Sequence, residues 1–367
     1  MLRVTLREAL AAYKREVDAE LRRIFDRKVA AAGHPALATF YERVKEYVAP
    51  VGGEAKRVRP LLVKLGAESL PSTCPDEVVV LSVACAVELL HNASLFHDDV
   101  IDDHEVRRGR PTFHAVYSTE YADRARAGEV PERPGRAEEL GRNLGILGGD
   151  QVFFAGLELL WKLPVDPETK VSLVKAYQQA FNGVVEGVVL EEHLEDSPSV
   201  SLEEYLHVAR FKTAHLLVKS AEMGAVLAGA QEDLLEGLRR FVEAVGVAFQ
   251  VKDDVLGTFG DARHKPTDSD VREGKKTVLL AIALEKATVS QREVIERVVG
   301  NQAATSDDVQ RVREVFEQCG ALSGAGDLLE KLARTAAERL DRLKPRLRAE
   351  TADLLGELAR YVVDRTY

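Results

Sequence analysis

Apolar residues recur every three or four positions along nearly the whole chain, the spacing that places them on one face of an α-helix. No segment keeps the apolar-polar alternation of a half-buried strand between turn residues. The pattern therefore predicts an all-α helical bundle with no sheet. The connections predicted between its helices are short, with breaks at 52–53, 70–72, 109–111, 163–164 and 260–274.

Several helix starts are also visible in the sequence. Asp166-Pro167 places a capping side chain before a proline at the first helical position. Ser201 with Glu204, and Ser290 with Glu293, have the spacing of capping boxes. No linker interrupts the pattern, so residues 1–367 are predicted to form a single domain. One segment, about 119–140, is charged, contains Pro and Gly and is predicted to be an exposed, mobile loop excursion.

Composition excludes several classes of protein. The net charge of -10 argues against a nucleic-acid partner, which requires a basic surface. The three cysteines are too widely spaced for a disulfide framework or a paired metal site. The N-terminal thirty residues are charged throughout, and no later apolar run is read as a membrane span, so no transmembrane segment is expected. Cytoplasmic localisation is the resulting expectation.

The strongest chemical feature is an acidic cluster at the end of an apolar stretch. On a helix Asp98 and Asp102 share one face, as do Asp99 and Asp103. A run of charged residues is usually a solvated helix face. The apolar residues that precede Asp98 should be buried, however, so the carboxylates are expected to lie at a cleft. Carboxylates held close together there suit Mg²⁺, which is usually completed by water and substrate phosphate.

A second acidic pair, Asp253-Asp254, also ends an apolar helix and is expected to face the first across a cavity. Two basic clusters accompany the pairs, one at Lys56, Arg57 and Arg59, the other at Lys265, Lys275 and Lys276. Either basic cluster alone would be read as ordinary solvent-exposed charge. The occurrence of both with the two acidic pairs is what indicates a diphosphate-binding site. The histidines 91, 97, 104 and 114 lack the spacing of four that zinc-binding helices use, and zinc is not predicted.

These residues together resemble the trans-type polyprenyl diphosphate synthases, which include the geranylgeranyl diphosphate synthases. The family's GKRxRP, DDxxD, RRG, PTxH, GD, KT and FQxxDD motifs appear in this order along the chain, the GKRxRP glycine being replaced by Ala55. They are matched by Lys56-Arg57-Val58-Arg59-Pro60, Asp98-Asp99-x-x-Asp102, Arg107-Arg108-Gly109, Pro111-Thr112-Phe113-His114, Gly149-Asp150, Lys212-Thr213 and Phe249-Gln250-x-x-Asp253-Asp254. The resemblance implies one isoprenoid-synthase bundle around a central cavity.

The resemblance also implies roles for individual residues. Several magnesium ions per active site would be held by Asp98, Asp102 and Asp253, supported by Asp99 and Asp254. The allylic diphosphate would be bound by Arg107, Lys212, Lys265 and Lys275, and isopentenyl diphosphate by Lys56, Arg59, His91 and Arg108. Thr213 and Gln250 would line the developing carbocation. The implied reaction is head-to-tail elongation of an allylic diphosphate by a homodimeric prenyltransferase.

Two further positions, near the second acidic pair and on the helix before Lys212, depart from the family pattern. Gly257 replaces the third aspartate of the second motif, and Glu191 stands where the family's GQxxD element ends in aspartate. These departures leave open a non-catalytic subunit of a heteromeric synthase, although such subunits commonly lose the first motif, which is complete here. A class I terpene cyclase is the other alternative. It would have no use for Lys56, Arg59 and Arg108, and elongation is preferred.

Product length is predicted from the helix that carries the first acidic cluster. Ala93 and Ser94 lie five and four residues before Asp98, about one helical turn below the metal site. Farnesyl-producing relatives often carry an aromatic residue at one or both positions, whereas both are small here. A growing chain should therefore pass them and stop near Leu90 or Leu89. The predicted product is geranylgeranyl diphosphate, with twenty carbons, or a longer one.

Overall fold

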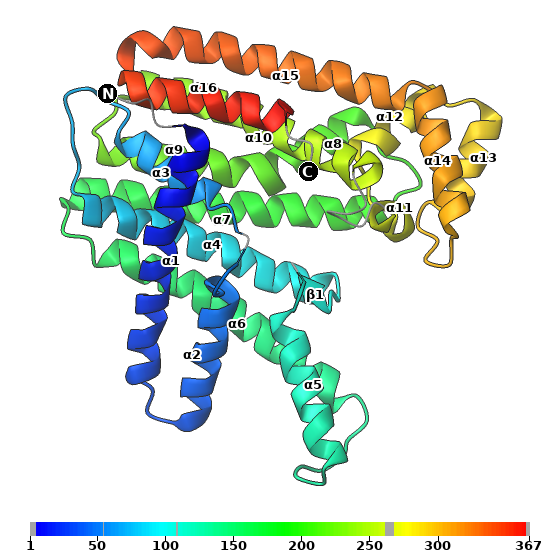
Figure 1. Cartoon of the computed structure of the whole chain (residues 1–367), viewed down its shortest axis with the longest axis horizontal. Helices are drawn as coiled ribbons and strands as arrows, with labels where there is room; N and C mark the ends of the chain where they lie inside the picture. The colour runs from blue at the N-terminus through cyan, green and yellow to red at the C-terminus, as the bar shows by residue number, and fades with distance from the viewer. Residues whose placement is uncertain (1–4, 54, 108, 261–267, 365–367) are drawn as a thin grey trace. The chain divides into compact units, whose positions relative to one another are not determined.

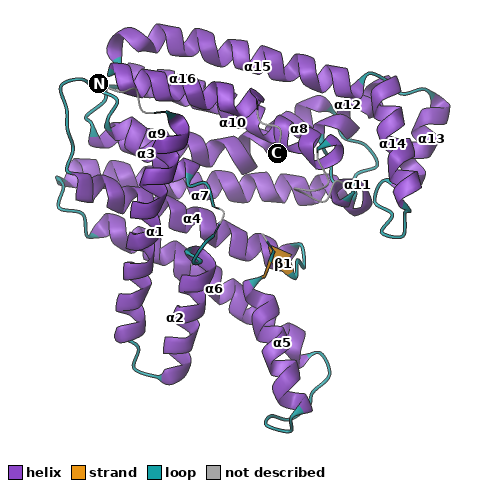
Figure 2. Cartoon of the chain, in the orientation of Figure 1, coloured by secondary structure: helices purple, strands orange, loops and turns teal. Residues whose placement is uncertain are grey.

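The computed structural model describes residues 5–53, 55–107, 109–260 and 268–364, and these residues form an all-α fold (Figures 1 and 2). The predicted fold class is therefore confirmed. Among the described residues the exception is a two-stranded antiparallel hairpin, β1 (Val106–Arg107) and β2 (Arg110–Pro111), which the helical periodicity did not predict. Two predicted site residues, Arg108 and Lys265, lie outside the described residues.

The helices group into two compact units, the first comprising residues 1–67 and 74–177 and the second residues 68–73 and 178–367. The first unit contains α1 (Leu6–Ala30), α2 (Pro35–Val48), α3 (Val58–Ala67), α4 (Glu77–Ile101), α5 (Phe113–Arg126) and α6 (Arg136–Trp161). The helix α7 (Pro167–Glu195) begins in the first unit and continues into the second.

Glycines allow α4 and α6 to pack closely in the first unit. A Cβ on Gly148 would meet the Phe96 ring at 2.7 Å, and one on Gly149 would meet His97 at 2.3 Å. Both helices are long and apolar enough to cross a membrane by length and composition, a criterion that the buried core helix of a globular protein also meets. In α4, 67% of the most apolar stretch is buried inside the protein. These apolar residues therefore build the core that supports the acidic cluster.

The charged segment 119–140 is not the loop that its composition predicted. The helix α5 extends to Arg126 and α6 begins at Arg136, so only the turn between them is irregular. The turn is held to α5 by the Tyr121 hydroxyl, which donates to the Pro131 carbonyl at 2.8 Å, and by Arg124, which donates to Glu129. The charged side chains cover the solvent side of a helical hairpin whose inner side packs α5 against α6.

In the second unit, α10 is the central helix and packs against α9, α15 and α16 (Figure 1). The helical elements of this unit, besides the second part of α7, are α8 (Leu202–Val208), the π-helix η1 (Ala209–Ala214), α9 (His215–Leu227), α10 (Glu232–Phe259), α11 (Ser269–Glu273), α12 (Val278–Lys286), α13 (Val289–Val298), α14 (Ser306–Gln318), α15 (Ala321–Leu343), the 3-10 turn η2 (Lys344–Arg346) and α16 (Ala349–Asp364).

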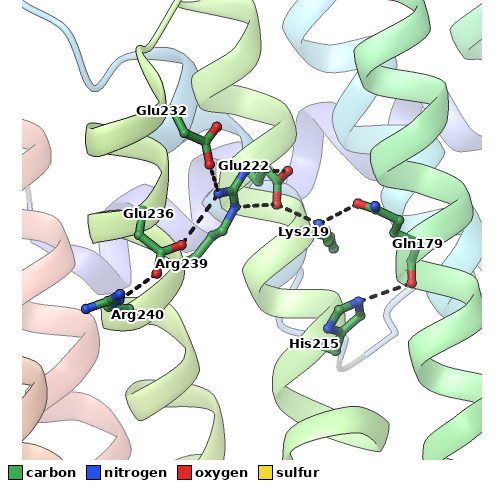
Figure 3. A network of polar contacts seen from close by, with 8 residues as sticks. All are labelled: Gln179, His215, Lys219, Glu222, Glu232, Glu236, Arg239 and Arg240. Carbon is green, nitrogen blue, oxygen red and sulfur yellow. Dashed lines mark hydrogen bonds and ion pairs between the residues drawn. The ribbon is translucent and has the colours of Figure 1, made fainter.

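An ionic network joins three helices of this unit (Figure 3). Glu222 of α9 accepts hydrogen bonds from Arg239 of α10 at 3.0 Å and from Lys219 at 2.9 Å. Lys219 also donates to Gln179 of α7 at 2.8 Å. Lys219 and Glu222 are both buried, and buried charges are stable only when paired in this way. The network therefore fixes α7, α9 and α10 to one another.

Two of the predicted helix starts are confirmed and one is wrong. Asp166 accepts a hydrogen bond from the Thr169 N–H, and Ser201 forms a capping box with Glu204. The helix α13 instead begins after Thr288, which forms a capping box with Gln291. Thr288 satisfies the same pattern two residues before Ser290 and follows directly on the end of α12, so the helix starts there.

Candidate active site

The first acidic cluster lies at the C-terminal end of α4, where its members differ in exposure. Asp98 is half-buried, and Asp102, the C-cap residue whose N–H donates to the Asp98 carbonyl one turn earlier, is exposed. Asp99 is 1% exposed and faces the protein interior. The predicted sharing of a face by Asp98 and Asp102 therefore holds. Two carboxylates are open to ligands and a third is enclosed.

The enclosed carboxylate organises the residues around it. Asp99 accepts a hydrogen bond from the Tyr47 hydroxyl of α2 at 2.5 Å, and it also binds Nε of Arg107. A terminal nitrogen of Arg107 lies 3.6 Å from Asp98. Because Asp99 fixes Arg107 from the buried side, the guanidinium is held beside the open carboxylate. The sequence singled out Asp99 and Arg107 as site residues, but it predicted neither their pairing nor the contact with Tyr47.

The position of the cluster favours a cation. The C-terminal end of a helix carries a partial negative charge, so three carboxylates there repel both it and one another. Within the described residues, no three His, Cys, Asp or Glu side chains gather into a site that could hold a metal alone. Mg²⁺ needs no such cage, because water and substrate phosphate complete its shell. Asp98 and Asp102 fit that requirement.

The second acidic pair divides in the same way. Asp253 is half-buried near the C-terminal end of α10, whereas Asp254 is buried. The Asp254 carboxylate accepts hydrogen bonds from Gln250 at 2.8 Å and from the Val278 backbone N–H at 3.0 Å. Burial raises the pKa of Asp254 to about 7, although the hydrogen bonds it accepts oppose this shift. Asp254 thus anchors the start of α12, and Asp253 remains accessible to a metal.

The same carboxylate ends a chain of hydrogen bonds that reaches the predicted carbocation-lining residues. The Thr213 hydroxyl donates to the Gln250 side-chain oxygen at 2.6 Å, and the Gln250 amide donates to Asp254. Thr213 belongs to η1, so the relay connects η1, α10 and α12. The relay fixes the orientation of the Gln250 amide, because its oxygen must face the Thr213 hydroxyl and its nitrogen must face Asp254.

Lys212 lies in the π-helical turn η1, a geometry that often marks functional positions. Its ammonium forms an ion pair with Glu191 of α7. The backbone of α7 comes so close that a Cβ on Gly187 would lie 2.3 Å from the Lys212 backbone nitrogen. Glu191 and Gly187, the ends of the altered GQxxD element, therefore hold Lys212 by charge and by close packing. The sequence did not predict this pairing.

Two predicted lysines precede α12. Lys275 lies 2.9 Å from Glu273, and Lys276 donates to the Ser197 carbonyl at 2.9 Å. Lys275 also lines a small pocket, whereas Lys276 is tied to the backbone. The side chains around this pocket are Thr258, Asp270, Val271, Lys275, Thr277, Leu280, Val299 and Phe316.

The first basic cluster alternates between the outside and the interior. Lys56 is exposed and Arg59 half-buried, while the side chain of Arg57 between them is 1% exposed. On α4, His91 and Ser94 are half-buried seven and four residues before Asp98, on the same stripe of the helix. Ala93 is fully buried on another side of α4. The Ser94 hydroxyl donates to the His91 carbonyl at 2.8 Å.

Comparison with known proteins adds three findings. A family model described as polyprenyl synthetase matches residues 39–317. The chain is 31% identical to a geranylfarnesyl diphosphate synthase of Aeropyrum pernix, over 84% of this chain and 90% of that protein. It is 29% identical to a geranylgeranyl diphosphate synthase of Saccharolobus solfataricus, over 84% and 86%. The solved geranylgeranyl pyrophosphate synthase of Corynebacterium glutamicum, complexed with isoprenyl diphosphate and magnesium, superposes with a TM-score of 0.86 at 26% identity, covering 99% of this chain and 100% of that one.

Proposed function

Since this chain belongs to the polyprenyl synthetase family, we propose that it condenses isopentenyl diphosphate head to tail with an allylic diphosphate, releasing pyrophosphate. The chain is accordingly a prenyltransferase. The observation that carries the proposal is the end of α4, where Asp98 and Asp102 are open to a cation and Asp99 holds Arg107 beside them. Such an arrangement binds a metal-complexed diphosphate and stabilises its departure.

We propose Mg²⁺ as the cofactor, with Asp98, Asp102 and Asp253 as its protein ligands. When bound, it neutralises the substrate diphosphate and stabilises the leaving pyrophosphate as a Lewis acid. The basic residues supply the remaining charge. Arg107, Lys212 and Lys275 are assigned to the allylic diphosphate, and Lys56, Arg59 and His91 to isopentenyl diphosphate. Arg108 and Lys265 keep the roles proposed from the sequence.

The organisation of the side chains supports this assignment. An allylic diphosphate ionises only if the charge of pyrophosphate is stabilised as the carbon–oxygen bond breaks. Arg107 and Lys212 are each held by a carboxylate, Asp99 and Glu191 respectively, so their positions are set before substrate arrives. Thr213 and Gln250 present fixed dipoles to the carbocation through the relay that ends on Asp254. The alkene of isopentenyl diphosphate then attacks the allylic carbon, and the cation that results loses a proton to the released pyrophosphate.

We propose geranylgeranyl diphosphate as the main product. Ser94 lies on the stripe of α4 that carries Asp98, one turn closer to the N-terminus, and its small side chain leaves room for the growing chain. The bulky Leu89 and Leu90 come next along the helix. The products in the relatives' names, geranylgeranyl and geranylfarnesyl diphosphate, agree with a stop at this depth or beyond.

We also propose that the enzyme is a homodimer. Leu147, Phe154 and Trp161 follow one another at intervals of seven on α6, so they share one side of the helix. Each is more than half exposed. An exposed row of large apolar side chains is typical of a protein interface, and α6 of a second copy offers a matching surface. We also propose a cytoplasmic location, which is supported by the burial of most of the apolar part of α4.

One assay tests the function. The purified chain is incubated with Mg²⁺, labelled isopentenyl diphosphate and dimethylallyl, geranyl or farnesyl diphosphate, and the products are separated by chain length. An elongated prenyl diphosphate is the expected result. A cyclic hydrocarbon would identify a terpene cyclase instead, and no product from any primer would indicate a non-catalytic subunit.

A further inference from the structure

Arg57 is buried at the junction of four helices. Its terminal nitrogens donate to the Val48 carbonyl at the end of α2, at 2.7 Å, and to the Glu88 carboxylate on α4. Its Nε donates to Asp18 on α1 at 2.8 Å. The Arg57 carbonyl accepts from the Leu61 N–H at 3.2 Å and so begins α3. One residue therefore links α1, α2 and α4 to the start of α3.

The backbone of Arg57 adopts a conformation that favours glycine. Its φ is +53°, in the left-handed region that is unfavourable for a residue with a side chain. Such a conformation persists only when surrounding contacts impose it. Here the imposing contacts are those of the guanidinium. Because the chain turns at this point, Arg57 faces the interior while Lys56 faces outward.

The two carboxylates that bind Arg57 differ in how deeply they are buried. The side chain of Glu88 is 4% exposed, and it is an isolated acid in the apolar run of α4. A buried carboxylate without its partner is strongly unfavourable. Asp18 is less buried and has a second partner, Lys14. The Arg57–Glu88 pair is therefore the tightly constrained part of the junction, and it fixes the loop before α3 to α4.

We infer that Arg57 is a positioning residue for isopentenyl diphosphate, holding Lys56 and Arg59 in the orientation that binds the substrate's diphosphate. The inference rests on the proposed function, which assigns these two neighbours to that substrate. A planar guanidinium with several donors in fixed directions serves this purpose, because it sets position and angle together. A lysine at the same place would keep the charge but bond at a single point.

The test compares Arg57→Lys with Lys56→Ala and with the double variant, measuring the KM of each substrate, kcat and calorimetric binding of isopentenyl diphosphate. We expect Arg57→Lys to raise the KM for isopentenyl diphosphate by about tenfold and to change that for the allylic substrate by less than about twofold. The double variant should lose less binding free energy than the sum of the two single losses, because Arg57 acts in part through Lys56, whereas additive losses would show that the two residues act independently.

Two further variants separate positioning from folding. Arg57→Met with Glu88→Gln removes both charges of the buried pair, so a folded protein is expected, with the KM for isopentenyl diphosphate still raised. Arg239→Lys is the matched control, since Arg239 also joins helices through carboxylates but is assigned no substrate. It should lower thermal stability without changing either KM.

The outcomes distinguish the two hypotheses. An unchanged KM for isopentenyl diphosphate in Arg57→Lys, or an equal rise for both substrates, would overturn the inference while Lys56→Ala still supports the proposed function. If Lys56→Ala leaves binding of isopentenyl diphosphate unchanged, the assigned substrate site is wrong, and the inference about Arg57 is rejected with it.

Discussion

The carboxylate of Asp254 accepts a hydrogen bond from the backbone N–H of Val278 at 3.0 Å, and it thereby caps the first turn of α12. Its neighbour Asp253 is half-buried and remains accessible. The first cluster repeats this division, with Asp99 enclosed and Asp98 accessible. In each pair, one carboxylate is available for a metal and the other stabilises the structure around it.

This division predicts opposite effects for two adjacent substitutions. Asp253→Asn should lower kcat/KM by about a hundredfold and leave the free energy of unfolding unchanged, because it removes a metal ligand. Asp254→Asn should lower the free energy of unfolding by about 1–3 kcal/mol, because an amide donor then opposes a buried backbone N–H. Urea unfolding and steady-state assays of both variants measure these effects. Equal losses of stability would contradict the assignment.

Activity should depend on magnesium through the accessible carboxylates of α4. Asp98→Ala and Asp102→Ala should each reduce turnover by about a hundredfold or more, and a chelator should abolish activity of the unmodified enzyme. Asp123→Ala is the matched control, because Asp123 is an exposed carboxylate of α5 paired with Arg126. Full activity in chelator, or in the two aspartate variants, would end the metal assignment.

Product length should respond to the small residues below the metal site. Ser94→Phe should shorten the main product towards fifteen carbons while primer consumption continues, because an aromatic ring would block the path along α4. The sequence predicts the same for Ala93→Phe, but Ala93 is fully buried on another side of α4, so this substitution should mainly overpack the core and cost about 1–3 kcal/mol of stability. Chromatographic sizing of products gives the answer. An unchanged distribution in both variants would show that other helices limit the chain.

The dimer should depend on the apolar row of α6. Phe154→Lys places a charge in the middle of the proposed interface and should shift the protein from dimer to monomer in sedimentation at micromolar concentration. Val289→Lys serves as the control, since Val289 is a similarly exposed apolar residue on α13. A monomeric unmodified protein, or a dimer that tolerates the Phe154 substitution, would refute this interface.

The ionic network of the second unit should make stability sensitive to acid. Burial raises the pKa of Glu222, but hydrogen bonds from Arg239 and Lys219 outweigh it and leave the pKa below its usual value. A carboxyl with a lowered folded-state pKa stabilises the fold above its unfolded pKa, about 4.3, and this contribution is lost as pH falls further.

Unfolding measured between pH 7 and pH 3 tests this expectation. Glu222→Gln should be less stable at pH 7, and the difference from the unmodified protein should shrink as the pH falls. Glu285→Gln on α12 provides a carboxylate substitution outside the network. A difference that stays constant with pH would show that the charge of Glu222 contributes nothing to stability.

The sequence by itself determined the local structure and the chemistry at each position. Helical periodicity placed Asp98 and Asp102 on one face, and Ser201 and Glu204 marked the start of α8, because both depend on residues within about one turn. The sequence also predicted that both acidic pairs lie near the ends of apolar helices. It misjudged the charged segment around residues 119–140, since a polar composition does not distinguish a loop from a solvent-facing helical hairpin.

The tertiary structure alone decided which partners each charged group meets. Tyr47 binds Asp99, Arg57 binds Glu88, and Glu191 binds Lys212, across separations of 52, 31 and 21 residues. A periodic pattern shows which residues share a helix face, but it does not show which other helix packs there. Burial then fixes the role of each carboxylate, because a charge removed from water must be paired, whereas a half-exposed one stays available to a ligand.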